Sequence, residues 1–254
     1  MKSVLFVCLV ASTLTAVAVH SAVLQSTVQA HAVQLRVMQA RTMQARTRQR
    51  GVHVEMASAN YAQAWPQADD NDAWIVTVDN SGQLYFGIDP MTPQELKQWM
   101  IQHPRKRDQK LYIKADARAS YASVEKALEA GNAVEFAEPV LLVNQRGDSA
   151  GPGTEVSPKG WEVALDGASQ DAQAVVVEVS GALNETTVTI NHQTVAWESL
   201  QDRLRELAQD QDKDKNENSI LVEANGRATF AQVARVIDAC RAVKAKAVLT
   251  AAML

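Results

Sequence analysis

The chain has 254 residues, of which 46% are hydrophobic and 21% are charged, and its formal net charge is −4 at pH 7. This composition excludes disordered, collagen-like and disulfide-rich classes, and the two cysteines, Cys8 and Cys240, cannot form a disulfide framework. Residues 1–50 hold six basic and no acidic residues, which leaves a net charge of −10 on residues 51–254. Nucleic-acid binding needs clustered positive charge, so this acidic body argues against it.

An uncharged stretch runs from Val4 to Leu24. A helix of this length can cross a bilayer, so the sequence predicts a transmembrane anchor over residues 1–24. A cleaved secretory signal is the alternative, because Lys2 precedes an apolar run that ends near Ala16-Val17-Ala18. A soluble buried helix is a third interpretation. Residues 25–50 are rich in Gln, Ala and Arg, lack proline and glycine, and are interpreted as a stalk.

The most informative feature of the chain is an internal repeat. The segment Leu-Tyr-Ile-Lys-Ala-Asp at 111–116 returns as Ile-Leu-Val-Glu-Ala-Asn at 220–225, an offset of 109 positions. At the same offset Tyr121 corresponds to Phe230. Earlier in each copy the offset is 104, and the five additional residues fall in the polar run 209–218, where a solvated loop tolerates insertions.

The first copy alternates predicted strands and helices. Strands are expected at 74–79, 83–87, 110–114 and 139–143. Thr92 and Glu95 form a capping box with proline at the first helical position, so a helix begins there. Ser120 is the predicted N-cap of a second helix, which ends near Gly131.

The second copy has the same predicted order. Strands are expected near 174–180, 186–191, 219–223 and 246–251, and helices near 196–208 and 229–242. The order ββαβαβ predicts an α/β (α+β) fold, with two tandem domains whose helices pack on mixed sheets. We therefore expect one domain at 51–145, a Gly- and Pro-rich linker at 146–173 and a second domain at 174–254.

A search for catalytic or metal-binding patterns gives no positive prediction. Five histidines are scattered without a short-spaced ligand pair, and neither a Cys-x-x-Cys nor a Gly-x-Ser-x-Gly segment occurs. Gly151-Pro152-Gly153 lacks the preceding strand and the Gly-Lys-Ser/Thr of a phosphate loop. The sequence predicts no catalytic residue, no metal ligand and no cofactor-binding residue, so we expect a protein without enzymatic activity.

Three further features have a functional and a structural interpretation. Asp116 could be a general base, but its counterpart Asn225 cannot ionise, which favours a loop residue that binds backbone amides. Tyr121 and Phe230 could form a ligand platform, although core packing is the simpler interpretation. The basic run 105–107 fits a solvated helix end better than an anion site.

The order of these elements resembles the periplasmic domain of ExbD/TolR biopolymer-transport proteins. Leu111–Asp116 is similar to the family's strand ending in Lys-Ala-Asp, and the following helix of the family resembles residues 233–238. Residues 51–56, Gly-Val-His-Val-Glu-Met, look like the family's Gly-Val-x-Val-x-Leu segment after its membrane helix, with Ala57 where the family has proline. Ser3 precedes Val-Leu-Phe-Val where the family carries an aspartate.

The resemblance implies a single-pass protein of the cell inner membrane with its C-terminal domains in the periplasm. It also implies an ExbB/TolQ-like membrane partner, a TonB- or TolA-like partner, and a role in coupling proton flow to transport. The duplication itself suggests self-association as an internal pseudo-dimer, because homologous surfaces tend to pair isologously. A secreted periplasmic binding or scaffold module without a motor role is the alternative, and an enzyme is a third.

Overall fold

We describe the fold from a computed structural model, which places residues 51–103, 109–136, 138–146, 157–166, 175–181, 186–210, 219–225 and 227–250. Both copies of the repeat belong to one structural unit, residues 48–254. The expected membrane helix, the stalk, the basic run 105–107 and the glycines of 151–153 all lie outside the described residues. Within the described ranges, no helix has both the length and the apolar character needed to cross a membrane.

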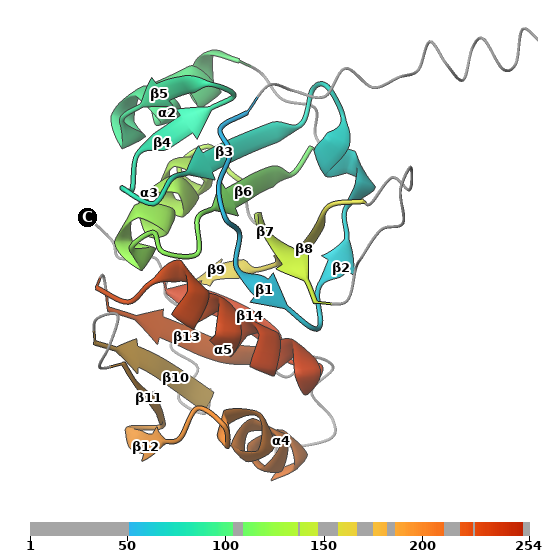
Figure 1. Cartoon of the computed structure of the whole chain (residues 1–254), viewed down its shortest axis with the longest axis vertical. Coiled ribbons are helices and arrows are strands. Elements are labelled where there is room, and N and C mark those ends of the chain that lie inside the picture. The colour runs from blue at the N-terminus through green and yellow to red at the C-terminus, as the bar shows by residue number, and fades with distance from the viewer. Residues whose placement is uncertain are drawn as a thin grey trace, which may run out of the picture. The chain divides into compact units, whose positions relative to one another are not determined.

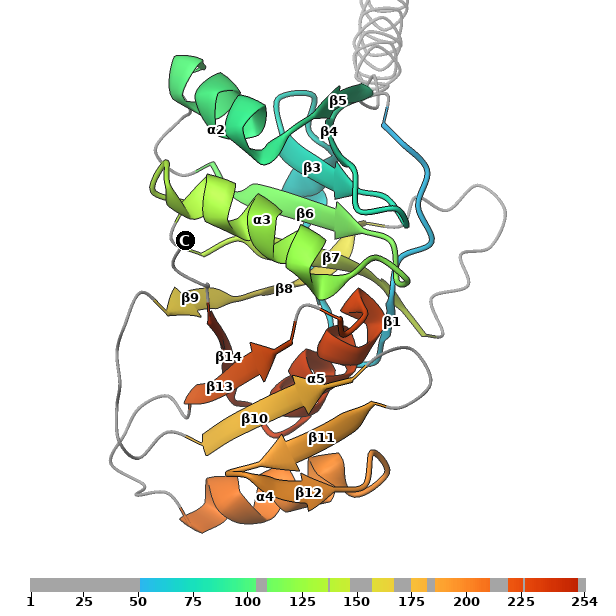
Figure 2. The ribbon, with the colours of Figure 1, turned by 90° about the vertical axis from the view of Figure 1, so that its left-hand side faces the viewer.

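The first half of this unit contains three antiparallel strands, followed by alternating helices and parallel strands (Figure 1). In chain order the elements are β3 (Trp74–Val78), β4 (Leu84–Phe86), β5 (Asp89–Met91), α2 (Pro93–Gln102), β6 (Leu111–Ala115), α3 (Tyr121–Asn132) and β7 (Val140–Gln145). β3, β6 and β7 are parallel, and β4 and β5 extend the sheet as antiparallel strands. In Figure 2, α2 and α3 lie over one face of this sheet.

The second half repeats the same order of elements. These are β10 (Val175–Ser180), β11 (Thr187–Ile190), β12 (Gln193–Val195), α4 (Leu200–Asp210), β13 (Ser219–Ala224), α5 (Phe230–Ala242) and β14 (Lys246–Thr250). The pairing is also the same, with β10, β13 and β14 parallel and β11 and β12 antiparallel. The described residues therefore form a mixed α/β structure with four α-helices and two mixed sheets, as expected.

Two details of the sequence prediction are wrong. Each half has a third antiparallel strand, β5 or β12, so the order is βββαβαβ and not ββαβαβ. The helix expected from residue 196 begins at Leu200, because residues 196–199 form a turn in which the Ser199 N–H donates to the Ala196 carbonyl at 3.0 Å. Both differences concern short segments near turns, where local sequence patterns are weakest.

The region between the halves contains strands that the sequence analysis did not predict. β8 (Lys159–Glu162) pairs antiparallel with β7 in the first sheet, and β9 (Ala164–Asp166) pairs parallel with β14 in the second. Both lie in the range 146–173 that was expected to be a linker. Gly160 allows β8 to approach β7 closely, because an added Cβ would lie 2.6 Å from the Leu141 carbonyl oxygen.

Short N-terminal elements complete the first sheet. β1 (Ser58–Ala59) pairs with β7, β2 (Gln63–Ala64) pairs with β8, and the 3₁₀-helix η1 (Pro66–Asp69) follows. The strand order is β2-β8-β7-β6-β3-β4-β5 in the first sheet and β12-β11-β10-β13-β14-β9 in the second.

The predicted helix caps explain why the chain forms helices at these positions. The Glu95 N–H donates to the Thr92 Oγ1 at 3.2 Å, and the Glu95 carboxylate accepts from the Thr92 N–H at 2.8 Å, which confirms the capping box. In the second half, the Gln232 Oε1 accepts from the Thr229 N–H at 2.8 Å. The N-cap of α3 is Ser120, as expected, although its side chain makes no capping hydrogen bond.

A single apolar cluster runs through both halves. In the first half it packs strand residues such as Ile113 against helix residues such as Val124, and in the second it packs Val222 against Val233. A separate, smaller cluster lies on the other face of the first sheet, where Tyr112, Val140 and Leu142 are covered by Ala68 and Ala73. The halves thus share one core, while the first sheet has a second packed face.

Candidate functional site

The two halves meet through equivalent residues at the starts of α3 and α5. The Tyr121 N–H donates to the Ala228 carbonyl at 2.7 Å, and the Phe230 N–H donates to the Ala119 carbonyl at 2.8 Å. Between these two hydrogen bonds, Ser120 and Thr229 form an antiparallel bridge. At the offset of 109, Tyr121 corresponds to Phe230 and Ala119 corresponds to Ala228, so the two hydrogen bonds are equivalent. The contact is therefore isologous, like that of a two-fold dimer.

The turns that lead into this contact are also equivalent. The Asp116 Oδ1 accepts from the Arg118 N–H at 3.0 Å, and the Asn225 Oδ1 accepts from the Arg227 N–H at 2.8 Å. The carbonyl oxygens of both residues accept a backbone N–H three positions later, at 3.0 and 2.9 Å. The Asn225 amide and the Asp116 carboxylate therefore accept equivalent hydrogen bonds from the backbone, which confirms the interpretation of Asp116 as a loop residue that binds backbone amides.

Asp116 differs from Asn225 in what surrounds its carboxylate. The side chain is buried, and its oxygens accept from the Arg118 Nε at 2.9 Å, the Arg118 Nη2 at 3.1 Å and the Glu55 N–H at 3.1 Å. The Arg118 guanidinium lowers the pKa of Asp116 to about 2, against the opposing effect of burial and with help from the backbone donors. The carboxylate is therefore ionised at neutral pH, and both of its oxygens already accept hydrogen bonds, whereas a general base needs an oxygen free to accept a proton.

The aromatic residues at this contact belong to the core, as expected. Tyr121 is 1% exposed and Phe230 is 0% exposed, so neither presents a platform to a ligand. The Tyr121 hydroxyl is buried without a hydrogen-bond partner, and burial raises its pKa. The residue at the equivalent position of the second half, Phe230, has no hydroxyl.

A second contact between the halves has no symmetric counterpart among the residues that the structure describes. Asp238, which is 7% exposed on α5, accepts hydrogen bonds from the N-terminal segment of the first half. Its carboxylate binds the Asn60 N–H at 3.0 and 3.1 Å, the Asn60 Nδ2 at 3.0 Å and the Tyr61 N–H at 2.8 Å. The residue equivalent to Asp238 on α3 is Glu129, a half-buried side chain whose pKa is raised by burial and by the charge of Glu125.

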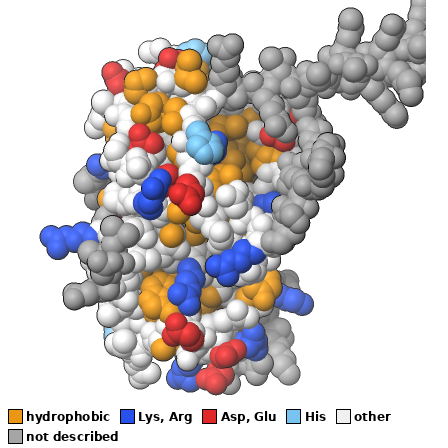
Figure 3. All heavy atoms as spheres, in the orientation of Figure 1, with side chains coloured by type: hydrophobic (Ala, Val, Ile, Leu, Met, Phe, Trp, Pro, Cys, Tyr) orange, Lys and Arg blue, Asp and Glu red, His pale blue; other side chains and the backbone are white. Residues whose placement is uncertain are grey.

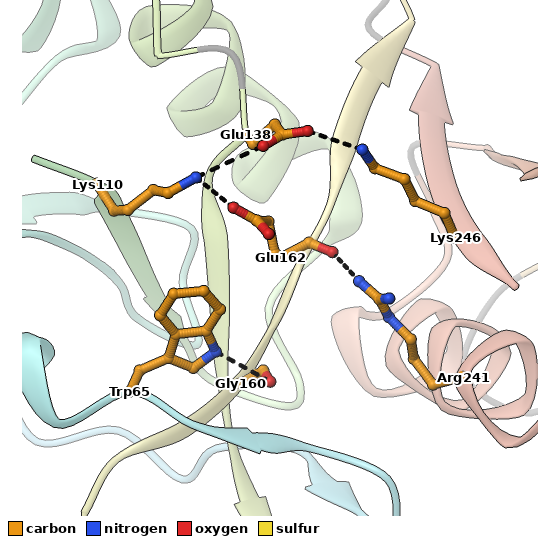
Figure 4. Close-up of polar contacts among 7 residues, drawn as sticks. All are labelled: Trp65, Lys110, Glu138, Gly160, Glu162, Arg241 and Lys246. Carbon is orange, nitrogen blue, oxygen red and sulfur yellow. Dashed lines mark hydrogen bonds and ion pairs between the residues drawn. The ribbon is translucent and has the colours of Figure 1, made fainter. Parts of the chain in front are cut away.

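Charged side chains surround the strands that cross between the halves (Figure 4). Glu138 accepts from the Lys246 Nζ at 2.7 Å and lies 3.6 Å from the Lys110 Nζ, so it joins a lysine from each half. Lys110 also pairs with the Glu162 carboxylate, and the Arg241 guanidinium donates to the Glu162 carbonyl. Lys246, with a smaller contribution from Lys110, lowers the pKa of Glu138 against the effect of burial.

The histidines and the cysteine of the described chain do not form a reactive site. His103 stacks on Trp99 with ring centroids 4.1 Å apart, and the His192 Nδ1 lies 3.1 Å from the Glu178 carboxylate. Burial raises the pKa of Cys240 to about 12, so its thiol is protonated. The residues that the structure places include no group of three or more side chains suited to hold a metal ion.

The sequence analysis missed the asymmetric contact of Asp238 with Asn60 and the strands β8 and β9. Asp238 could have been noticed, because it is the one carboxylate between Phe230 and Ala242, in a helix with few other polar residues. A carboxylate in such a helix usually has a specific partner. Large apolar residues recur at every second position at Trp161, Val163 and Leu165, which is a strand pattern inside the expected linker.

Comparison with protein families gives one result. The family model described as "Biopolymer transport protein ExbD/TolR" matches residues 35–145 and 154–252, which together are well over half of the chain. Neither a curated protein nor a solved structure matches the chain.

Proposed function

Because the chain belongs to the ExbD/TolR family of biopolymer transport proteins, we propose that it is a non-enzymatic component of an energy-transducing complex of the inner membrane. Members of this family are inner-membrane proteins with periplasmic domains. The observation that carries the proposal is the family match over both halves of the chain, 35–145 and 154–252. Residues 1–24 would be the membrane anchor, residues 25–50 the stalk, and both repeats would lie in the periplasm.

The proposed role of the repeats is contact with other proteins. The segments 51–145 and 174–254 would be two ExbD/TolR-like domains that form an internal pseudo-dimer, joined by residues 146–173. The reciprocal hydrogen bonds of Tyr121 with Ala228 and of Phe230 with Ala119 support this arrangement. An ExbB/TolQ-like protein in the membrane and a TonB- or TolA-like protein in the periplasm are the proposed partners.

Purification from native membranes tests this proposal. The full chain, tagged at its C-terminus and cross-linked before solubilisation, should co-purify with a protein that mass spectrometry identifies as ExbB/TolQ-like. Its N-terminus should be intact, with Lys2 and Ser3 present.

The alternative is a secreted periplasmic scaffold, which Lys2 and the Ala16-Val17-Ala18 segment favour. Recovery of the chain in the soluble periplasmic fraction, cleaved after Ala18 and without an ExbB/TolQ-like partner, would replace the motor proposal with this one.

A further inference from the structure

A cavity of about 490 Å³ lies on the face of the first sheet that is opposite α2 and α3. Ile75, Thr77, Lys114 and Leu142 contribute to its lining from the sheet. Met56, Ala68 and Pro158 line it from the surrounding segments. Figure 3 shows apolar side chains recessed in a hollow of this half of the molecule. The volume falls within the range of small-molecule sites, which is about 300 to 1,000 Å³.

Sheet register places a hydroxyl beside an ammonium in this cavity. Thr77 and Lys114 are direct partners in the parallel pair of β3 with β6, and Lys114 is in turn the partner of Leu142 on β7. The Lys114 Nζ donates to the Val52 carbonyl at 3.2 Å. Because an ammonium has three N–H donors, Lys114 can donate to a ligand as well. Burial lowers the pKa of Lys114, because the charged ammonium loses part of its contact with water.

Gln145, from the end of β7, also lines the cavity, although its Oε1 is fully buried and is not exposed to a ligand there. Two acids, Asp69 and Asp70, and a second lysine, Lys159, also line the cavity. The two acids would repel a polyanion, so the lining fits a ligand with at most one negative charge.

The second half does not repeat this arrangement. Glu178 and Glu223 are partners in the pair of β10 with β13, at the positions that Thr77 and Lys114 occupy in the first half. The Glu178 carboxylate is already bound by the Thr189 hydroxyl at 2.8 Å and lies 3.1 Å from the His192 Nδ1. The equivalent pair in the second half has two carboxylates and no cation, so the cation beside a hydroxyl is particular to the first half.

We propose that this cavity binds a monocarboxylate ligand that has an apolar body. The carboxylate would bind the Lys114 ammonium and the Thr77 hydroxyl, and the apolar body would lie against Ile75 and Leu142. This inference goes beyond the proposed transport role and does not depend on it, because it rests only on the geometry of one cavity.

Titration of the full chain with N-acetyl derivatives of alanine, leucine and phenylalanine tests the proposal. Each acid is compared with its primary amide, which keeps the N–H and the apolar group but removes the charge. We expect the best acid to bind at least about 10-fold more tightly than its amide, as one charge-assisted hydrogen bond requires. Methyl resonances of Met56, Ile75 and Leu142 should shift, while those of Val176 and Leu221 in the second half should not.

Three variants make the test specific. Lys114→Gln should reduce the affinity for the acid about 10-fold or more and remove the preference over the amide, whereas Lys114→Arg should retain the preference. Glu223→Gln, at the equivalent position of the second half, is the matched control and should leave both affinities unchanged. Equal binding of acids and amides to the unmodified chain, no binding of either, or an unchanged preference in Lys114→Gln would each overturn the proposal.

A pentapeptide that ends in leucine with a free carboxylate identifies the source of the ligand. If it binds more tightly than N-acetyl-leucine, the natural ligand is the carboxyl terminus of a polypeptide. If it binds equally or less tightly, the ligand is a small free acid.

Discussion

The two halves of this protein follow the same path, yet they use their sheets differently. The turns Asp116–Ser120 and Asn225–Thr229 make the same hydrogen bonds and meet each other across a pseudo-two-fold contact. On the sheet faces the pairs have opposite character, with Thr77 beside Lys114 in the first half and Glu178 beside Glu223 in the second. The comparison teaches that backbone-mediated contacts persist after duplication, while side chains that do not support the backbone are free to diverge.

The largest effect is expected from a substitution that breaks the asymmetric contact between the halves. Asp238→Ala removes the acceptor for the N–H groups of Asn60 and Tyr61 and leaves these donors unpaired in a partly buried place. We expect the free energy of unfolding to fall by about 3 kcal/mol, measured by urea denaturation of the full chain. Glu129→Ala, the equivalent change on α3, should cost less than about 1 kcal/mol. Equal losses would show that Asp238 does not hold the halves together.

A smaller loss of stability is expected when the carboxylate of Asp116 is replaced by the amide that the second half has at the equivalent position. Asp116→Asn keeps the acceptor that Asn225 provides in the second half but loses the ion pair with Arg118. We expect a loss of about 1 to 2 kcal/mol at pH 7.

The same substitution should change the dependence of stability on pH. The folded pKa of Asp116, about 2, lies below its ordinary value, so ionisation stabilises the folded state above about pH 4. This contribution is lost as the pH falls from about 4 through 2, and the difference between Asp116→Asn and the unmodified chain should shrink in that window. A difference that stays constant from pH 7 to pH 2 would contradict the ionised state of Asp116.

Replacing the unpaired tyrosine should stabilise the protein. Tyr121→Phe reproduces the residue found at the equivalent position, Phe230, and removes a buried hydroxyl that has no partner. We expect the free energy of unfolding to rise by about 1 kcal/mol, seen as a higher Tm in calorimetry. The reverse change, Phe230→Tyr, should be destabilising. A Tyr121→Phe variant that loses stability would mean that the hydroxyl has a role in the folded state.

The smallest effect concerns the half-exposed charges around the crossing strands. Glu138→Gln weakens the ion pairs with Lys246 and Lys110. We expect a loss of less than about 1 kcal/mol, because exposed ion pairs contribute little and are screened by salt. The loss should be measurable at low ionic strength and absent in 1 M NaCl. A loss that salt leaves unchanged would indicate packing and not charge.

The repeat made most of this fold predictable from sequence. The comparison of Leu111–Asp116 with Ile220–Asn225 correctly placed two parallel strands and the helices that follow them, because alternating apolar residues and helix caps are local signals. β5 and β12 were missed because their sequences, Asp-Pro-Met and Gln-Thr-Val, lack the continuous run of apolar and aromatic strand formers that β4, Leu-Tyr-Phe, contains. β8 and β9 were missed because the glycines and prolines between 147 and 158 predicted a linker throughout.

The contacts between the halves were less predictable. The internal pseudo-dimer was expected from the duplication alone, but nothing local predicts that Asp238 binds Asn60, which lies 178 positions earlier. The cavity on the first sheet depends on sheet register and on the segment from Met56 to Asp70, neither of which a single sequence specifies. Such contacts depend on tertiary packing and not on local propensity.

The crossing from β8 to β9 constrains how this tandem protein can change its length. Only Val163 separates the two strands; it is 0% exposed, and its N–H donates to the Pro139 carbonyl at 3.0 Å. One inserted residue at this point would reverse the facing of every side chain on β9, since side chains alternate along a strand. The single residue between β8 and β9 thus fixes the spacing between the β7–β8 pair and the β9–β14 pair, and we expect tolerated insertions elsewhere in the chain.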